Sequence, residues 1–185
     1  MDTPHALTLD LPAARALLDA LGQPGFRARQ LLEWVFARQV LDPVEMSNLP
    51  KPLRAELAER LDWSLPEVVD RLDAGDGSFK LLLSSPRGKI ESVVMRYDKR
   101  TSLCVSSQVG CRLACRFCQT GRLGMVRDLS AAEILVQVGL ADQLLKPEGR
   151  RVTNVVFMGM GEPLDNYEAT VTAVRRLTAE DGFGL

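Results

Sequence analysis

The stretch CVSSQVGCRLACRFCQTG, residues 104–121, contains all four cysteines of the 185-residue chain. Cys111, Cys115 and Cys118 follow the spacing C-x3-C-x2-C, and Cys104 stands apart, seven residues before the first of them. Three thiolates on one short loop can anchor an iron–sulfur cluster and leave one metal position open, as catalytic zinc sites do. The spacing therefore favours a metal or cluster site at these three cysteines, separate from Cys104.

Two other uses of the cysteines remain open on spacing alone. Cys104 could supply a fourth thiolate to a structural zinc site, although the usual zinc pattern is two separated C-x2-C pairs. A disulfide framework is disfavoured by the expected compartment. The N-terminus MDTPHALTLD lacks the basic flank and apolar core of a secretory signal, and no apolar run approaches the roughly 20 residues that span a bilayer. We therefore expect a cytoplasmic protein with reduced thiols.

Charge is unevenly distributed along the chain, although the net charge is only −1. Residues 87–127 carry nine basic and two acidic side chains, whereas residues 1–86 and 128–185 are both net acidic. The positive charge is thus centred on the cysteines, which favours an anionic partner such as RNA. A solvated basic loop would fit the charge equally well.

Residues 1–63 have the pattern of a helical accessory domain. Leucines recur at helical spacing, Pro12 stands near one helix start, and Gly22 follows its end. The only histidine, His5, lies in a terminus that we expect to be frayed, so we do not expect it to be a ligand. The expected helices are LPAARALLDALG, FRARQLLEWVFARQV and PLRAELAERL.

Residues 64–99 predict a small antiparallel β linker, and residues 100–185 predict a βαβα unit. In the linker, EVVDRL, FKLLLS and KIESVVMRY are short segments rich in β-formers, separated by turn sequences. Beyond the cysteines, Ser130 and Glu133 form a capping box that starts a helix. The apolar strand VTNVVFM then ends in GMGEP, and a second helix follows.

Strand, helix, strand, helix implies parallel strands and an α/β fold. Ligand sites in such folds form at the C-terminal ends of the strands, so the cysteine segment and GMGEP should face one pocket. Two parallel strands cannot close a barrel. We therefore expect a chain that ends at Leu185 to be a truncated part of a larger protein.

The cysteine spacing, with an aromatic residue before the last cysteine in CRFC, resembles that of the radical S-adenosylmethionine (SAM) superfamily. TSLCVSSQVGCRLACRFCQTG followed by VTNVVFMGMGEPLDN is similar, more specifically, to the RlmN/Cfr family of RNA methyltransferases. The resemblance covers all 185 residues. It implies a helical accessory domain, a β linker and the first βαβα portion of a partial (β/α)6 radical SAM barrel.

The resemblance also implies roles for individual residues. Cys111, Cys115 and Cys118 would hold a 4Fe–4S cluster, and the open iron would bind SAM. Gly161 and Glu162 of GMGEP would contact the amino-acid end of SAM, although glycine and proline in this segment also fit a plain strand-to-helix turn. The family would further make Glu91 a proton acceptor and Cys104 a cysteine that resolves a covalent enzyme–RNA adduct. From the residues alone, Glu91 equally fits a solvent-facing strand position and Cys104 a small buried apolar position.

The activity implied by the resemblance is methylation of carbon 2 of adenosine in 23S ribosomal RNA and in transfer RNA. An external, flavodoxin-like electron donor and a monomeric parent protein are expected with it. The family needs a further cysteine that carries the methyl group, and the four cysteines here leave none for that role. We therefore expect this chain alone to be inactive. Another radical SAM enzyme, or a non-catalytic module that binds iron–sulfur or RNA, are the alternatives.

Overall fold

The computed structural model describes residues 3–185, which form two compact units. One unit combines the residues up to 64 with residues 174–184, and the other comprises residues 65–173. The division into parts at residues 63 and 99 stays a prediction of the sequence. Within residues 3–185, no helix has both the length and the apolar character needed to cross a bilayer.

The first unit is helical, as predicted. Its first long helix starts at Asp10, whose Oδ1 accepts the Ala13 amide at 2.8 Å, and Pro12 lies in the first turn. Leu18 and Leu57, which were predicted to lie on apolar faces, are fully buried. The elements are η1 (Ala6–Thr8), α1 (Leu11–Ala20), α2 (Phe26–Leu32), the π-helical turn η2 (Glu33–Ala37), η3 (Pro43–Glu45) and α3 (Lys51–Arg60).

The expectation of a frayed terminus around His5 was wrong. The His5 side chain is buried, its Nδ1 accepts the Leu7 amide at 3.1 Å, and its Nε2 lies 2.9 Å from the Ser64 carbonyl oxygen. The neighbouring backbone is also paired, because the Ala6 amide donates to the Asp62 carbonyl. The contacts with Asp62 and Ser64 join segments up to 59 residues apart in sequence, a pairing that no local pattern encodes.

The last residues of the chain belong to the same helical unit. The rings of Phe36 and Phe183 meet edge to face with centroids 5.2 Å apart. Asp181 accepts the Leu11 amide at 2.8 Å and pairs with Arg176 at 2.9 Å. Residues 176–183 are therefore part of the packing of this unit.

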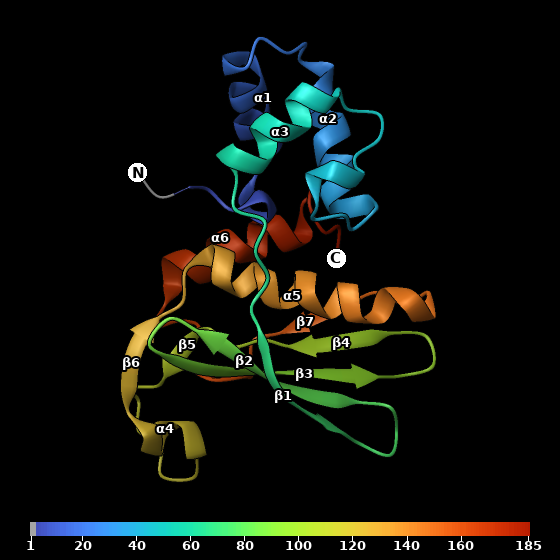
Figure 1. Ribbon diagram of the computed structural model, residues 1–185. Coiled ribbons are helices and arrows are strands. Elements are labelled where there is room, and N and C mark those ends of the chain that lie inside the picture. Colours follow the sequence, from blue (N-terminus) through green and yellow to red (C-terminus); the bar gives the residue numbers. More distant parts are fainter. Residues whose placement is uncertain (1–2) are drawn as a thin grey trace. The chain divides into compact units, whose positions relative to one another are not determined.

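The second unit is built on a five-stranded sheet with the order β1-β2-β3-β4-β7 (Figure 1). A separate antiparallel pair, β5 with β6, lies along the connection between β4 and β7. The strands are β1 (Val68–Asp73), β2 (Phe79–Ser85), β3 (Gly88–Arg96), β4 (Thr101–Cys104), β5 (Gln108–Gly110), β6 (Met125–Asp128) and β7 (Asn154–Val156). The helices are α4 (Gln119–Leu123), α5 (Ala131–Leu145), η4 (Lys146–Glu148) and α6 (Tyr167–Thr178), and the residues of α6 from 174 onward belong to the first unit.

The predicted βαβα unit is confirmed. Strands β4 and β7 are parallel, with Leu103 opposite Val155, and α5 lies on the connection between them. The capping box at the start of α5 is present, with Ser130 accepting the Glu133 amide and Glu133 accepting the Ser130 amide. Strand β7 covers only three residues of the predicted VTNVVFM strand, because β4 alone pairs with it among residues 3–185.

The two faces of the sheet differ. On β3, Ile90, Ser92 and Val94 are buried, whereas the alternate residues are only partly covered. Helix α5 lies along the buried face, as Figure 1 shows. The other face carries Glu91 and, from β4, Cys104.

Candidate functional site

The segments CVSSQ and GMGEP follow the C-terminal ends of the two parallel strands, and the structure pairs them with each other. The Gly159 amide donates to the Val105 carbonyl at 3.1 Å, and the Ser107 amide donates to the Met160 carbonyl at 2.8 Å. The Met160 amide donates to Ser106 Oγ at 2.9 Å. The two segments therefore lie together at one end of the sheet, and the expectation that the cysteines and GMGEP face one pocket stays a prediction.

Gly161 is the residue that this close approach requires. Its φ angle is +102°, and a Cβ atom placed there would lie 2.7 Å from Gln108 Cβ and 2.7 Å from Ser107 Oγ. Any side chain would combine an unfavourable backbone conformation with a collision. Glycine at this position thus brings the residues from 159 to 163, which we call the GMGEP loop, against β5.

Gln108 fixes the backbone of Glu162. Its side chain is fully buried, and its Oε1 accepts the Glu162 amide at 2.9 Å. Its Nε2 donates to Asp128 Oδ1 and to Asp165 Oδ2, both at 2.8 Å. The Glu162 carboxylate accepts the Leu164 amide at 3.1 Å, and the residue is only partly buried. A partly accessible carboxylate is thus held at the end of the sheet on an ordered backbone.

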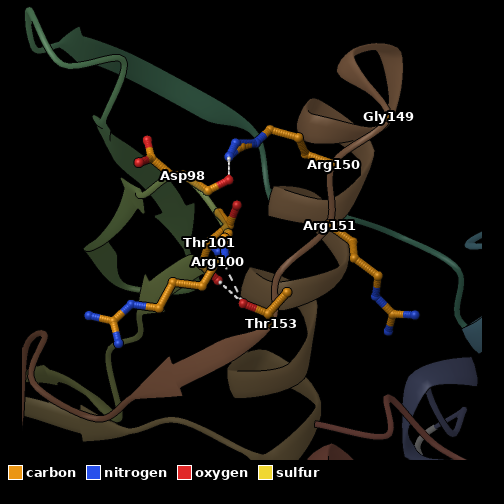
Figure 2. A pocket seen from close by; sticks show the side chains of 8 residues that line it. Asp98, Arg100, Thr101, Gly149, Arg150, Arg151 and Thr153 are labelled. Atoms are coloured by element: carbon orange, nitrogen blue, oxygen red, sulfur yellow. Dashed lines mark hydrogen bonds between the residues drawn. The ribbon is translucent and has the colours of Figure 1, made fainter.

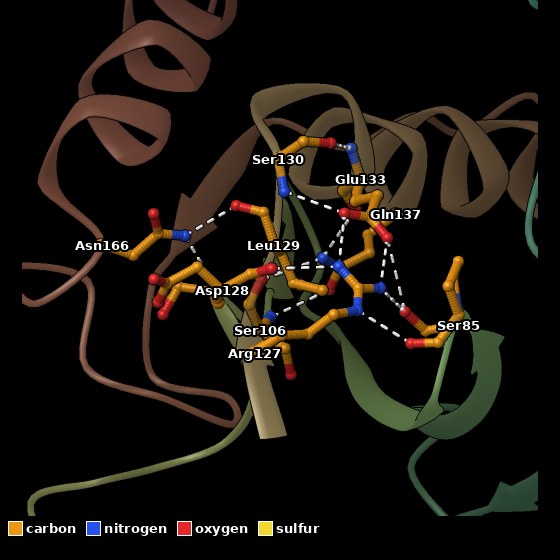
Figure 3. A network of polar contacts seen from close by, with 11 residues as sticks. Ser85, Ser106, Arg127, Asp128, Leu129, Ser130, Glu133, Gln137 and Asn166 are labelled. Carbon is orange, nitrogen blue, oxygen red and sulfur yellow. Dashed lines mark hydrogen bonds and ion pairs between the residues drawn. The ribbon is translucent and has the colours of Figure 1, made fainter. Parts of the chain in front are cut away.

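Gln137 of α5 forms hydrogen bonds to the CVSSQ segment (Figure 3). It is fully buried, and its Oε1 accepts the Ser106 amide and the Ser92 hydroxyl, both at 2.8 Å. Its Nε2 donates to the carbonyl oxygens of Ser106 and Glu133, at 2.9 and 3.0 Å. One side chain therefore ties the helix to β3 and to the turn after β4.

Arg127 extends this polar network to the β2–β3 turn. Its guanidinium makes a two-pronged ion pair with Glu133 at 2.5 and 2.9 Å, and it donates to Ser85 Oγ at 2.6 Å (Figure 3). Burial pushes the pKa of Glu133 upward, but hydrogen bonds from Arg127 and Ser130 outweigh this effect and leave the pKa lowered. The carboxylate is therefore charged at neutral pH.

The three spaced cysteines lie on a loop of residues 111–118, here called the cysteine loop. All their thiols are free; Cys111 is buried, Cys118 is partly buried and Cys115 is exposed. Across residues 3–185, no three metal-binding side chains are gathered closely enough to hold an ion.

The donor set nevertheless fits an iron–sulfur cluster. Hydrogen bonds from the backbone of Gly121, then from the backbone and side chain of Thr120, lower the pKa of Cys118 against a weaker opposing effect of burial. The thiolate is the form that ligates metal, so these donors favour the ligating form. Three free thiols within eight residues supply one ligand fewer than a cubane cluster takes.

Cys104 and Glu91 lie on the same face of the sheet. Cys104 pairs with Val93 across β4 and β3, and Glu91 is two positions further along β3, so their side chains share a face. Burial raises the pKa of Cys104, only partly offset by a hydrogen bond from the Met158 backbone. Glu91 forms an ion pair with Lys80 at 2.9 Å, and both side chains are 41% exposed.

A basic hollow of about 280 Å³ lies at the opposite ends of the same two strands. It is formed by the β3–β4 turn and by the segment before β7, where Thr153 Oγ1 accepts the Thr101 amide at 3.0 Å. Figure 2 shows Arg150 reaching toward the β3–β4 turn, while Arg100 and Arg151 point outward. The lining residues are Asp98, Lys99, Arg100, Thr101, Gly149, Arg150, Arg151 and Thr153.

Sequence reasoning missed the residues that hold the site together. Gln137 is the one for which a signal existed, since it is an uncharged polar residue inside the apolar run EILVQVGLADQLL. Gln108 and Asp165 carried no such signal, because polar residues in loops are ordinary.

Comparison with known proteins gives matches to both parts of the chain. Residues 6–62 match the family described as the ribosomal RNA large subunit methyltransferase N-terminal domain. The crystal structure of a radical SAM methyltransferase from Sphaerobacter thermophilus superposes with a TM-score of 0.89 and 43% sequence identity. It covers 98% of this chain, which corresponds to 54% of that protein.

Curated relatives are similar to this chain over nearly its whole length. The dual-specificity RNA methyltransferase RlmN of Alkalilimnicola ehrlichii is 48% identical over 98% of this chain and 51% of its own length. That of Halorhodospira halophila is 46% identical over 97% of this chain and 50% of its own length. The chain spans about half the length of the curated relatives it matches. In sequence and in fold, the chain is therefore similar to about half of an RlmN methyltransferase.

Proposed function

We propose that this chain is part of a radical SAM methyltransferase that methylates carbon 2 of adenosine in 23S ribosomal RNA and in transfer RNA. The observation that carries the proposal is the pairing of CVSSQ with the GMGEP loop at the C-terminal ends of two parallel strands, next to three free thiols. The names of the relatives supply the substrate class, since both are called dual-specificity RNA methyltransferases.

The cofactors that we propose are a 4Fe–4S cluster and SAM. Cys111, Cys115 and Cys118 would ligate the cluster, which would supply the electron for reductive cleavage of SAM. Glu162 suits the ammonium group of SAM because it presents a partly accessible carboxylate on a backbone fixed by Gln108. Gly161 leaves the backbone of the loop open to close approach by a ligand.

Glu91 and Cys104 would act on the RNA. Both lie on the sheet face away from α5, so a base placed over that face would meet both side chains. We assign Glu91 as the proton acceptor and Cys104 as the thiol that resolves the covalent adduct. Because the Cys104 thiol is neutral at neutral pH, it must lose its proton when it reacts.

A test of the activity uses a hybrid protein. Residues 1–185 would replace the matching half of the Alkalilimnicola ehrlichii relative, and 2-methyladenosine would be measured in 23S ribosomal RNA and transfer RNA by mass spectrometry. We expect the modification in both RNAs, and no product from the 185-residue chain alone, which has no cysteine left to carry the methyl group. A folded hybrid that binds SAM but methylates neither RNA would contradict the proposal.

RNA contact is proposed for the helical unit and for the basic segment 87–127. The hollow at the β3–β4 turn offers cationic side chains from this segment, Lys99 and Arg100, beside Arg150. Clustered cations of this kind neutralise backbone phosphates without reading sequence. An external, flavodoxin-like electron donor, a monomeric protein and a cytoplasmic location complete the proposal.

Removing two cations from the hollow should weaken RNA binding in a salt-dependent way. For Lys99→Gln/Arg100→Gln, the slope of log affinity against log salt concentration for a transfer RNA should fall by about one for each phosphate that is no longer neutralised. Fluorescence anisotropy at several salt concentrations measures this slope. Asp98→Asn is the matched control, because removing an acid from the same hollow should strengthen binding. Unchanged slopes in both variants would exclude the hollow from the RNA interface.

A further inference from the structure

An ion pair connects the cysteine loop to the segment that follows the GMGEP loop. Arg112, directly after the first cysteine, places its Nε 2.7 Å from Asp165 Oδ2. Its Nη2 lies 3.8 Å from Asp128 Oδ2 on β6. These contacts join the loop that carries the three cysteines to β6 and to the segment directly after the GMGEP loop.

The two carboxylates also meet at a buried amide. Gln108 Nε2 donates to both Asp128 Oδ1 and Asp165 Oδ2, each at 2.8 Å, so the two acids are close neighbours. The other end of the same amide holds the Glu162 backbone. Gln108 is fully buried, so it cannot turn toward solvent to release either acid.

The two carboxylates that accept from this amide repel each other, and a nearby cation offsets that repulsion. Arg112 is the cation that contacts both. With Arg112 in place, the cluster of charges holds the loops together; without it, the remaining charges would push Asp165 away from Asp128. The Arg112 side chain is 54% exposed, so the effect of the ion pair is modest in size.

We propose that Gln108, Arg112, Asp128 and Asp165 form a clamp that positions the cysteine loop against the GMGEP loop, so that cluster ligation and binding of the amino-acid end of SAM favour each other. The coupling between cluster ligation and SAM binding rests on the proposed function, whereas the clamp itself rests on the contacts alone. Arg112 and Asp165 are positioning residues, since they act through the loops that they hold.

The first measurement needs no cofactor. Hydrogen–deuterium exchange of the amides in the cysteine loop is compared in the 185-residue chain and in Arg112→Gln, where we expect exchange about fivefold faster. Arg116→Gln removes an equal charge from an exposed position in the same loop and serves as the matched control, with exchange unchanged. Equal exchange in Arg112→Gln and Arg116→Gln would overturn the clamp.

Rescue distinguishes the clamp from a general loss of structure. In Arg112→Gln/Asp165→Asn the repulsion between the two acids is gone, and the amide of residue 165 can still accept from Gln108. We expect exchange within about twofold of the unsubstituted chain, a coupling that independent sites would not show. A double variant that exchanges faster than Arg112→Gln would contradict the role assigned to the charges.

The second measurement tests the link to the cofactors. After anaerobic reconstitution with iron and sulfide, SAM affinity is measured by calorimetry, and Arg112→Gln should bind SAM about fivefold more weakly than the unsubstituted chain or Arg116→Gln. Affinities that match in all three proteins would refute the coupling. If the unsubstituted chain takes up no iron, the proposed function fails, and the exchange experiment still decides on the clamp.

Discussion

Replacement of any one of Cys111, Cys115 or Cys118 by serine should lower the iron retained after anaerobic reconstitution by at least about tenfold, whereas Cys104→Ser should retain it. The reason is the placement of the thiols. Three lie on one loop, one of them with its thiolate stabilised by the backbone at the start of α4, whereas Cys104 lies back on β4 with its pKa raised by burial. Metal and sulfide analysis, with the visible absorption spectrum, measures the outcome.

The same experiment separates a cluster from a zinc site. A brown protein with about four iron atoms and matching sulfide per chain is expected for the unsubstituted sequence. A colourless protein with one zinc, whose binding fails in Cys104→Ser as it does in the other three, would instead establish a four-thiolate zinc site. Each variant changes only one sulfur to oxygen, and circular dichroism checks that the variants still fold.

Gln137→Leu should destabilise the chain by about 2–5 kcal/mol, the largest stability loss that we expect from one substitution. Leucine fills a similar volume but cannot accept from the Ser106 amide or donate to the Ser106 carbonyl, and both of these groups are buried. Each buried backbone group left without a partner costs about 1–3 kcal/mol. Urea unfolding followed by circular dichroism measures the change in the free energy of unfolding.

The matched control for this prediction is Gln119→Leu. Gln119 lies on α4 and is exposed, so the same chemical change there should shift the free energy of unfolding by no more than about 0.5 kcal/mol. A Gln137→Leu variant as stable as Gln119→Leu would show that the turn after β4 finds other partners. The support attributed to Gln137 would then be incorrect.

Much of the fold follows from local sequence signals. The capping box at Ser130, the helical leucine spacing and the β-formers in the segments that become β2 and β3 each act within a few residues, and each is confirmed. The buried His5 and the packing of Phe183 against Phe36 depend on segments far apart in the chain. Such contacts depend on the tertiary fold and leave no periodic pattern in the sequence.

The candidate site likewise combines motifs that the sequence reveals with contacts that only the tertiary fold creates. The cysteine spacing and GMGEP are compact motifs, and their place at the ends of parallel strands follows from the βαβ rule. The supporting residues Gln108, Arg112 and Gln137 act only through partners that the fold brings to them. Gln137 is noticeable in the sequence as a polar residue inside an apolar run, but nothing local indicates its partners, and Gln108 and Arg112 carry no signal at all.

The parallel pairing of β4 with β7 also sets the order in which the chain can fold. Strands β1 to β4 pair with their sequence neighbours, whereas Ser102 pairs with Asn154 after an intervening segment of about fifty residues. Local pairings form faster than distant ones, so the meander should form first during synthesis. Until β7 and the residues after it emerge from the ribosome, Arg112 of the cysteine loop lacks Asp165, its partner in the ion pair. We therefore expect a newly made chain to bind the cofactors proposed above only after β7 has joined the sheet.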